Sequence, residues 1–567
     1  MATRRSISAH EGGLEWTLPV FRSLDGYRRS WFAKDLVAGA LIVAIAIPLS
    51  MGMAEVAGMP PVVGLYSCVL PLVAYAFLGS SRQLVIALDA STAAMLAAAV
   101  TPLAGGDPET YATLAGLVAL LVGLILVVAG AVHLGFLGNF LSAPILLGYQ
   151  AGLAVVVTVS QIPRLLGVTL QEDATWRQVG EILTRLPETN GWTLAVGVSC
   201  LAMVLLLRRW RPAFPGALLS VVVATVAVEV LDLTERGVAV LGEIPSGLPG
   251  LALPSASLDD IAALLPAAAG IALVAAADTI VSSRAFAQRG RYEVDPNVDL
   301  IGLGAANLSS GVSGGISVSA SAARTAVAES VGSRSQVAGL TAALLMIAVL
   351  VFFTEPLASV PTAALSAVVI SAVIRLIEVE SLRKLWRVRR TEFVVAISTT
   401  LGAVFFGLLE GIVIAVVLSL LDLVRRAALP HDAVVGRLEG RHGLFDVERY
   451  PGARTHPAII VYRFDAPMFF ANVERFHDRV QHVLDADPHV RWLIVDLSVV
   501  ADVDATAAQA LIDLHDELQD RGVELVLVDL LARVEDLLRR AGVLERLGPG
   551  RVFDTAEDAI AAFDGGA

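Results

Sequence analysis

The stretch GGISVSASAARTAVAES, residues 314–330, is too polar and too short to cross a membrane as an ordinary helix, although long apolar segments surround it. A second stretch of this kind, LDASTAAMLAAAV, occupies residues 88–100. Ser91 lies 42 residues after Leu49, and Ser321 lies 43 residues after Asp278, so the two stretches hold matching places in two halves of the chain. Short interrupted spans in matching positions predict an inverted repeat with a binding site near the middle of the membrane.

The apolar segments around these stretches predict an α-helical polytopic membrane protein. The chain of 567 residues is 56% hydrophobic and 17% charged, whereas soluble domains carry about 25% charged residues. Fourteen segments have the length or the apolar character of membrane spans. They are residues 35–57, 62–78, 90–103, 111–132, 139–162, 192–207, 216–231, 261–286, 298–312, 318–330, 336–353, 358–374, 393–406 and 408–424. With both termini in the cytoplasm, this count leaves about 22 Lys and Arg inside and about four outside, as the positive-inside rule requires.

The net charge of −13 belongs almost wholly to the C-terminal tail. From residue 431 onward the chain has 25 acidic and 14 basic residues, and its patterns alternate between short apolar strands and amphipathic helices. We therefore predict a cytoplasmic N-terminal segment (1–34), a transmembrane domain (35–427) and a cytoplasmic α/β domain (428–567). The acidic balance argues against a nucleic-acid partner. Two cysteines, Cys68 and Cys200, cannot form a metal site, and we expect no cofactor and no enzymatic activity.

The two short stretches have the residue types of an anion site. A helix that begins inside the membrane leaves free N–H groups and a positive dipole end at that depth, and both favour an anion. Asp89 is placed to cap the first half-helix. Arg324 falls inside the second, where an arginine is rare unless it is paired or functional. The alternatives are a polar surface loop for the Ser/Gly-rich stretch, and for Arg324 a side chain that extends to the cytoplasmic interface.

Asp278 is a second charged residue in an apolar segment. A carboxylate at that depth is costly, so it needs a partner or a role. It could bind Na⁺ together with Ser282, which follows one helical turn later, or it could take up a proton. The alternative is a structural ion pair between Asp278 and Arg324. Glu55, near the outer end of the first span, is a further candidate proton carrier, unless it is simply solvated there.

Both parts of the chain resemble one protein family. In the tail, VYRFDAPMFFANVERF (461–476), LIVDLSVVADVDATAAQAL (493–511) and ELVLVDLLARVEDLLRRAGV (524–543) resemble the STAS domain of the SulP (sulfate permease) anion transporters. DLVAGALIVAIAIPLSMGMAEVAGMPPVVGLYSCVLP (35–71) resembles the first two spans of that family. The resemblance covers about residues 31–563. It implies a 7+7 inverted repeat with core and gate domains, elevator-type movement, a homodimer, and a place in the bacterial inner membrane with a cytoplasmic STAS domain.

The resemblance also implies positions for the site. It places the substrate between the two half-helix starts, near Arg324. The residues at those starts are Ala90, Ser91, Thr92, Ser321, Ala322 and Ala323. Asp278, Thr279 and Ser282 match the positions at which Na⁺-coupled bicarbonate members bind sodium. The chain departs from the family pattern at Ala87–Leu88, where many members have Gly-Pro, and at Leu49, where many have Gln. Ala505 replaces the phosphorylatable serine of related anti-sigma-factor antagonists, so we expect no phosphorylation switch there.

These observations favour secondary active transport of a small anion such as sulfate, bicarbonate or a C4-dicarboxylate, coupled to H⁺ or Na⁺. The alternatives are an uncoupled anion channel and a membrane signalling protein centred on the STAS domain. A channel would need no embedded ionisable residue such as Asp278. The sequence leaves both the anion and the coupling ion open.

Overall fold

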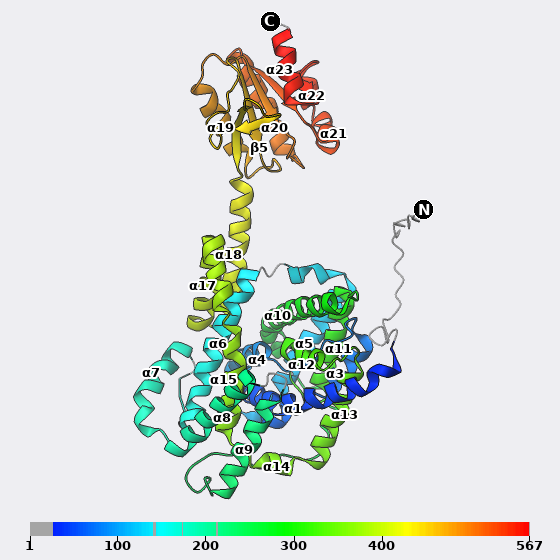
Figure 1. Cartoon of the computed structure of the whole chain (residues 1–567), viewed down its shortest axis with the longest axis vertical. Helices are drawn as coiled ribbons and strands as arrows, with labels where there is room; N and C mark the ends of the chain where they lie inside the picture. The colour runs from blue at the N-terminus through cyan, green and yellow to red at the C-terminus, as the bar shows by residue number, and fades with distance from the viewer. Residues whose placement is uncertain (1–26, 140–142, 173, 211–213, 566–567) are drawn as a thin grey trace. The chain divides into compact units, whose positions relative to one another are not determined.

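The computed structural model describes residues 27–139, 143–172, 174–210 and 214–565 (Figure 1). Most of the predicted N-terminal segment 1–34, and residues 140–142 of the fifth predicted span, lie outside the described residues. The chain forms two compact units, which divide between Val417 and Leu418 inside one long helix. Each unit is described by itself.

The first unit, together with α18, whose second half belongs to the second unit, has helices at all fourteen predicted spans. They are α1 (Phe32–Val56), α2 (Pro61–Tyr66) with α3 (Leu70–Leu78), α4 (Ala90–Ala104), α5 (Pro108–Ala131), α6 (Ala143–Leu166), α8 (Gly191–Trp210), α9 (Gly216–Val230), α10 (Leu258–Gly290), α11 (Pro296–Val312), α12 (Ala322–Ser330), α13 (Val337–Phe352), α15 (Thr362–Val373), α17 (Arg390–Phe405) and α18 (Leu408–Ala428). Among the described residues, seven helical segments are long and apolar enough to cross a membrane, and α4, α9 and α13 are shorter apolar helices.

Connecting elements of the first unit are short. They comprise the helices α7 (Thr175–Arg185), α14 (Glu355–Ala358) and α16 (Val379–Val388), the 3-10 turns η2 (Arg29–Trp31), η3 (Leu134–Asn139), η4 (Leu186–Glu188) and η5 (Ile374–Leu376), and the strands β1 (Ile86–Ala87) and β2 (Ser319–Ala320). The second predicted span, 62–78, is one of the seven long apolar segments, and it consists of two consecutive helices, α2 and α3. Pro71 lies in the first turn of α3, where its missing N–H is tolerated, whereas in a continuous helix it would clash with the preceding turn.

The helix contacts show the two-fold repeat directly. If α1–α9 and α10–α18 are exchanged, several of the main packing pairs are replaced by other pairs that the structure contains. Thus α1 packs on α13 as α10 packs on α5, and α1 packs on α12 as α10 packs on α4. In the same way α6 packs on α17 as α8 packs on α15. The half-helices α4 and α12 therefore occupy equivalent places in the two halves, as their spacing in the sequence predicted.

The second unit is an α/β domain built on one six-stranded sheet (Figure 1). Its elements are β3 (Asp432–Arg437), β4 (Leu444–Asp446), β5 (Ile459–Phe464), α19 (Val473–Asp485), β6 (Trp492–Asp496), α20 (Ala505–Asp520), β7 (Glu524–Val528), α21 (Ala532–Arg540), α22 (Val543–Leu547), β8 (Val552–Phe553) and α23 (Ala556–Gly565). The strand order is β4-β3-β5-β6-β7-β8, and the last four strands are parallel. Alternate residues of the parallel strands pack on α19–α22 on one face and on α23 on the other.

Asp529, which follows β7, gives this domain a testable pH dependence. Partial burial, together with the charges of Asp496 and Glu557, raises the pKa of its carboxyl. The unfolded chain therefore loses this proton at a lower pH than the folded chain, so stability falls as pH rises from about 4 through the folded pKa. We expect Asp529→Asn to raise the melting temperature at pH 7 by a few degrees. The backbone φ of 57° suits asparagine as well as aspartate.

Circular dichroism melting of the C-terminal unit at several pH values would test this. The gain from Asp529→Asn should shrink below pH 4, where the wild-type carboxyl is already protonated. Asp554→Asn is a matched control, because it removes a neighbouring carboxylate whose charge acts on Asp529 less than those of Asp496 and Glu557. An unchanged or lower melting temperature for Asp529→Asn at pH 7 would contradict the interpretation.

Candidate functional site

The two half-helices begin side by side because the strands before them pair. β1 and β2 are antiparallel, with Ile86 opposite Ala320 and Ala87 opposite Ser319. The N–H of Ser321 donates to the carbonyl of Val85 at 2.8 Å, which continues the pairing up to the first residues of α12. Ala90, Ser91, Thr92 and Ser321 are buried, while Ala322 and Ala323 are exposed. The structure thus brings the predicted substrate-binding residues of both halves together.

The start of α4 is capped by its own carboxylate. Asp89 Oδ2 accepts from the N–H of Ser91 at 3.4 Å and from its hydroxyl at 3.1 Å, so the predicted N-cap is confirmed. The Thr92 hydroxyl donates to the carbonyl of Asp89 at 3.1 Å. This carboxylate already offsets the positive end of the α4 dipole. The start of α4 therefore attracts an anion less strongly than the sequence suggested.

The start of α12 differs, because within the described part of the chain no side chain caps it. Ser321 takes the N-cap position without a side-chain hydrogen bond to the helix. Arg324 lies in the first turn and is 1% exposed. Its Nη2 donates to Ser50 Oγ at 2.9 Å and lies 3.5 Å from the carbonyl of Leu88, and the weakly accepting thiol of Cys68 lies beside it. Among the described residues, Arg324 Nε and Nη1 have no hydrogen-bond partner.

Asp278 lies on α10 close to this cluster. Its charge interacts with that of Asp89, and both carboxylates act on the buried hydroxyl of Tyr149. Within the described ranges, no ion pair joins Asp278 to Arg324, so the alternative of a structural pair does not hold in this structure. Thr279 Oγ1 is buried and has no partner among the described residues, and the half-buried Ser282 lies one turn beyond Asp278.

Glu55 lies at the far end of α1 and is not simply solvated. Its Oε2 is 2.8 Å from Arg164 Nη1, and its side chain is only 10% exposed. The carboxylate therefore has a specific cationic partner at the end of α6. The charged group that acts on Glu55 is Arg164, not Asp278 or Arg324. Glu55 therefore does not belong to the polar cluster around Arg324.

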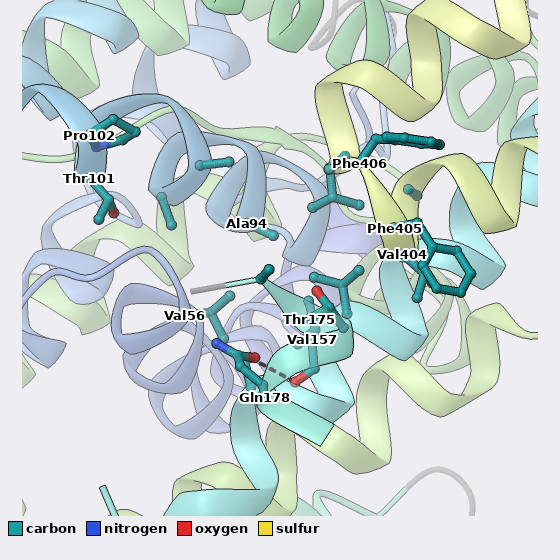
Figure 2. A pocket seen from close by; sticks show the side chains of 18 residues that line it. Val56, Ala94, Thr101, Pro102, Val157, Thr175, Gln178, Val404, Phe405 and Phe406 are labelled. Atoms are coloured by element: carbon teal, nitrogen blue, oxygen red, sulfur yellow. Dashed lines mark hydrogen bonds between the residues drawn. The ribbon is translucent and has the colours of Figure 1, made fainter. Parts of the chain in front are cut away.

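A cavity of about 600 Å³ lies beside the later turns of α4 (Figure 2). Figure 2 shows Ala94, Thr101 and Pro102 of α4 facing Val157 of α6 and Phe405 of α17 across this space. The described residues that line it include hydroxyl and amide groups but no charged side chain. A small anion would find no compensating charge in this cavity. The polar cluster around Arg324 is therefore the better candidate for the site.

Comparison with known proteins decides the family. The model of the sulfate permease family matches residues 32–399, and that of the STAS domain matches residues 450–559. The chain belongs to the sulfate permease family. A probable sulfate transporter of Mycobacterium tuberculosis is 41% identical over 538 residues, which cover 95% of this chain and 96% of that protein. The chloroplastic sulfate transporter 4.1 of Arabidopsis thaliana is 31% identical, covering 96% of this chain and 82% of that protein.

Solved structures show the same fold. The inward-facing murine Solute Carrier 26 family member A9 anion transporter has a TM-score of 0.89 at 22% identity, covering 99% of this chain and 96% of that one. The transmembrane domain of the cyanobacterial bicarbonate transporter BicA has a TM-score of 0.59 at 20% identity, covering 69% of this chain and 98% of that one. The predicted fold class, a helical membrane domain followed by a STAS domain, is confirmed. The relatives are named as transporters, in agreement with the prediction that the chain is not an enzyme.

Several residues that position the site in this sulfate-permease-family chain were not predicted. Asn307 of α11 accepts at Oδ1 from the Ser317 hydroxyl at 2.8 Å and from the N–H of Val318 at 3.0 Å. Its Nδ2 donates to the carbonyl of Val318 at 3.0 Å, so one side chain holds the segment that leads into β2. Ser50, the partner of Arg324, was also missed. A polar residue that lies 10 or more residues from its partner leaves no periodic signal in the sequence.

Two buried carboxylates were missed for a related reason. Asp299 accepts from the Tyr75 hydroxyl at 2.8 Å and from the N–H and hydroxyl of Ser80 at 2.9 Å, and the Ser283 hydroxyl donates to it. Asp35 accepts from the hydroxyls of Ser333 and Ser335 at 2.9 and 2.7 Å. Both lie in the first turn of a helix, where an acidic residue ordinarily indicates only a helix start.

Asn307→Ala is expected to destabilise the membrane domain by about 2–3 kcal/mol, because the Val318 N–H and the Ser317 hydroxyl would be buried without a partner. The melting temperature of the full-length protein in detergent would measure this. Ser309→Ala is a control on the same helix, since the bond that the described structure gives its hydroxyl is to the carbonyl of Ala306, one turn back. Equal melting temperatures for the two variants would show that Asn307 does not hold the approach to α12.

Proposed function

We propose that this chain carries a small oxyanion, with sulfate as the first candidate, by secondary active transport coupled to H⁺ or Na⁺. Bicarbonate and C4-dicarboxylates are the other candidate substrates. The observation that carries the proposal is Arg324, a buried guanidinium at the start of a half-helix that no described side chain caps. Two of its nitrogens lack hydrogen-bond partners among the described residues. A buried guanidinium that no carboxylate contacts is costly in an empty site, and a bound anion would reduce that cost.

The chemistry of the donors fits an oxyanion. The guanidinium presents N–H groups in a rigid plane, a geometry that suits two oxygens of sulfate or of a carboxylate. The first N–H groups of α12 and the positive end of its dipole favour the same ligand. Ser319 Oγ, also buried and without a partner among the described residues, offers a further polar contact. These groups meet where β1 and β2 bring the two halves together.

The charges around the site support coupling to a cation. Arg324 contributes one positive charge, whereas Asp89 and Asp278 contribute two negative charges when ionised. Adding a sulfate dianion would leave a net charge of −3 in a largely buried cluster, which is strongly unfavourable at low dielectric. Protonation of Asp278, or Na⁺ held by Asp278 with Thr279 and Ser282, would offset this charge. A cation that enters together with the anion is the basis of symport.

We also propose for this chain the elevator-type movement, the homodimer and the membrane orientation that the family resemblance implies. We infer that α12 and α10, which carry Arg324 and Asp278, move together with α1 and α4 as a core. This core would move against a gate formed by α6, α8, α15 and α17, in an elevator-type cycle. The chain would act as a homodimer in the plasma membrane, with both termini and the STAS domain in the cytoplasm. The abundance of Lys and Arg in the predicted inner loops supports that orientation.

Uptake into proteoliposomes tests the proposal. Purified full-length protein would be reconstituted, and uptake of labelled sulfate, bicarbonate and succinate measured while the pH and sodium gradients are varied independently. We expect saturable uptake of at least one of these anions, accelerated by an inward gradient of H⁺ or of Na⁺. Empty liposomes give the background. If none of the three anions enters above background under any gradient, the proposed transport function is wrong.

A further inference from the structure

A small cavity adjoins the candidate site on the side that the topology places in the cytoplasm. Its volume is about 130 Å³, which is enough for one oxyanion with a few water molecules. Leu49 of α1 and Ala323 of α12 form its inner wall, and these residues are the immediate neighbours of Ser50 and Arg324. The cavity therefore reaches the residues that directly precede Ser50 and Arg324 in the chain.

Two arginines line the outer part of this cavity. Arg208 lies at the end of α8, and Arg375 lies in η5, directly after α15. Their positive charges act on each other. Among the described residues, neither has a carboxylate partner, and the contact that the structure gives for Arg208 is a long one of 3.4 Å to the carbonyl of Ser371. Two like charges are thus held around one small cavity without compensation.

We propose that Arg208 and Arg375 form a second, peripheral binding site for the transported oxyanion at the cytoplasmic end of its pathway. This inference rests on the proposed function. An anion between the two guanidiniums would relieve their mutual repulsion, and this site would raise its local concentration next to Arg324. The two sites belong to different parts of the membrane domain, because α8 and α15 pack on each other whereas Arg324 belongs to α12, which packs on α1.

The size of the effect follows from simple electrostatics. At a dielectric constant close to that of water, each arginine charge several ångströms from the anion changes its binding by about threefold, so the pair contributes about tenfold. The attraction acts on anions in the cytoplasm and does not reach the outer side through the membrane domain. It also weakens as salt screens it.

Transport in membrane vesicles of opposite orientation tests the proposal with [³⁵S]sulfate as the probe. In inside-out vesicles that contain the full-length protein, the double variant Arg208→Gln/Arg375→Gln should raise the half-saturating sulfate concentration about tenfold at low ionic strength. In right-side-out vesicles it should leave that concentration unchanged. Arg209→Gln is the matched control, since it removes one charge from the same helix end but does not line the cavity. Arg208→Lys/Arg375→Lys keeps the charges and should behave like the wild type.

The outcomes separate this inference from the proposed function. If the double glutamine variant matches Arg209→Gln on the cytoplasmic side at every ionic strength, the peripheral site does not exist, while the transport function stands. The same conclusion follows if only the maximal rate falls, or if the lysine pair is as defective as the glutamine pair. The wild-type protein could carry bicarbonate or succinate but no sulfate in either orientation. In that case the same variants are compared with the anion that is carried, and that comparison decides whether the peripheral site exists. If no anion is carried, the proposed function itself is overturned, and this inference with it.

Discussion

Replacing Arg324 by glutamine should reduce sulfate uptake by about a hundredfold or more. The loss of a charge-assisted contact to a buried ligand typically costs about 2–5 kcal/mol, and each 1.4 kcal/mol is a factor of ten in affinity. Arg324→Lys keeps the charge but loses the planar arrangement of donors, so it should retain only part of the activity. Uptake by proteoliposomes at equal protein content would measure both variants. Arg334→Gln, at an exposed position beyond α12, is the control and should transport like the wild type.

A second readout separates a binding role of Arg324 from a structural one. In the described structure its guanidinium has no carboxylate partner, and two of its nitrogens lack any hydrogen bond. Such a group is expected to destabilise the empty protein rather than to support it. Arg324→Gln should therefore melt at the same temperature as the wild type or higher, and added sulfate should no longer raise its melting temperature. A large loss of thermal stability without sulfate would indicate a structural role.

Asp278→Asn should abolish uphill accumulation of the anion while leaving its binding intact. The substitution preserves shape but removes the ionisable group, so neither a proton nor Na⁺ can be taken up there. Because one negative charge next to the site is lost, sulfate should bind as well as before or more tightly. The measurement is accumulation of labelled sulfate under an imposed gradient, together with sulfate–sulfate exchange at equilibrium, which should persist. Accumulation should fall to the level of simple equilibration.

Glu55→Gln is the matched control for this experiment. Glu55 is also a carboxylate of the membrane domain, but it lies at the outer end of α1. There it forms an ion pair with Arg164. We expect Glu55→Gln to retain gradient-driven accumulation. If Asp278→Asn accumulates sulfate as the wild type does, Asp278 is not the coupling site. If Glu55→Gln is the variant that loses accumulation, the proton or ion pathway runs through the end of α1 instead.

The sequence predicted most of the architecture because the membrane leaves few alternatives. Apolar segments of sufficient length must form helices, and two short stretches at matching positions indicated the half-helices α4 and α12. Asp89 was predicted as a helix cap from its residue type and place alone. Arg324 stood out because a charge in an apolar segment is rare. Each of these predictions depends on local pattern.

What the sequence did not predict depends on partners that are distant along the chain. Ser50 contacts Arg324 across 274 residues, and Asp299 binds groups on α3 and the loop after it, more than 200 residues away. The ion pair of Glu55 with Arg164 joins the ends of α1 and α6. The sequence predicted both helices, but it did not predict that their ends are in contact. The absence of a link between Asp278 and Arg324 in the described structure likewise could not be deduced from spacing.

The measurement that tests the central claim most directly is a structure of the full-length protein with a bound anion. Selenate is a suitable probe, because it has the shape and charge of sulfate and contains a heavier atom. We predict selenate density within hydrogen-bond distance of Arg324 Nε or Nη1, at the start of α12. If selenate binds elsewhere in the membrane domain and those two nitrogens remain without a partner, the assignment of the site to Arg324 is contradicted.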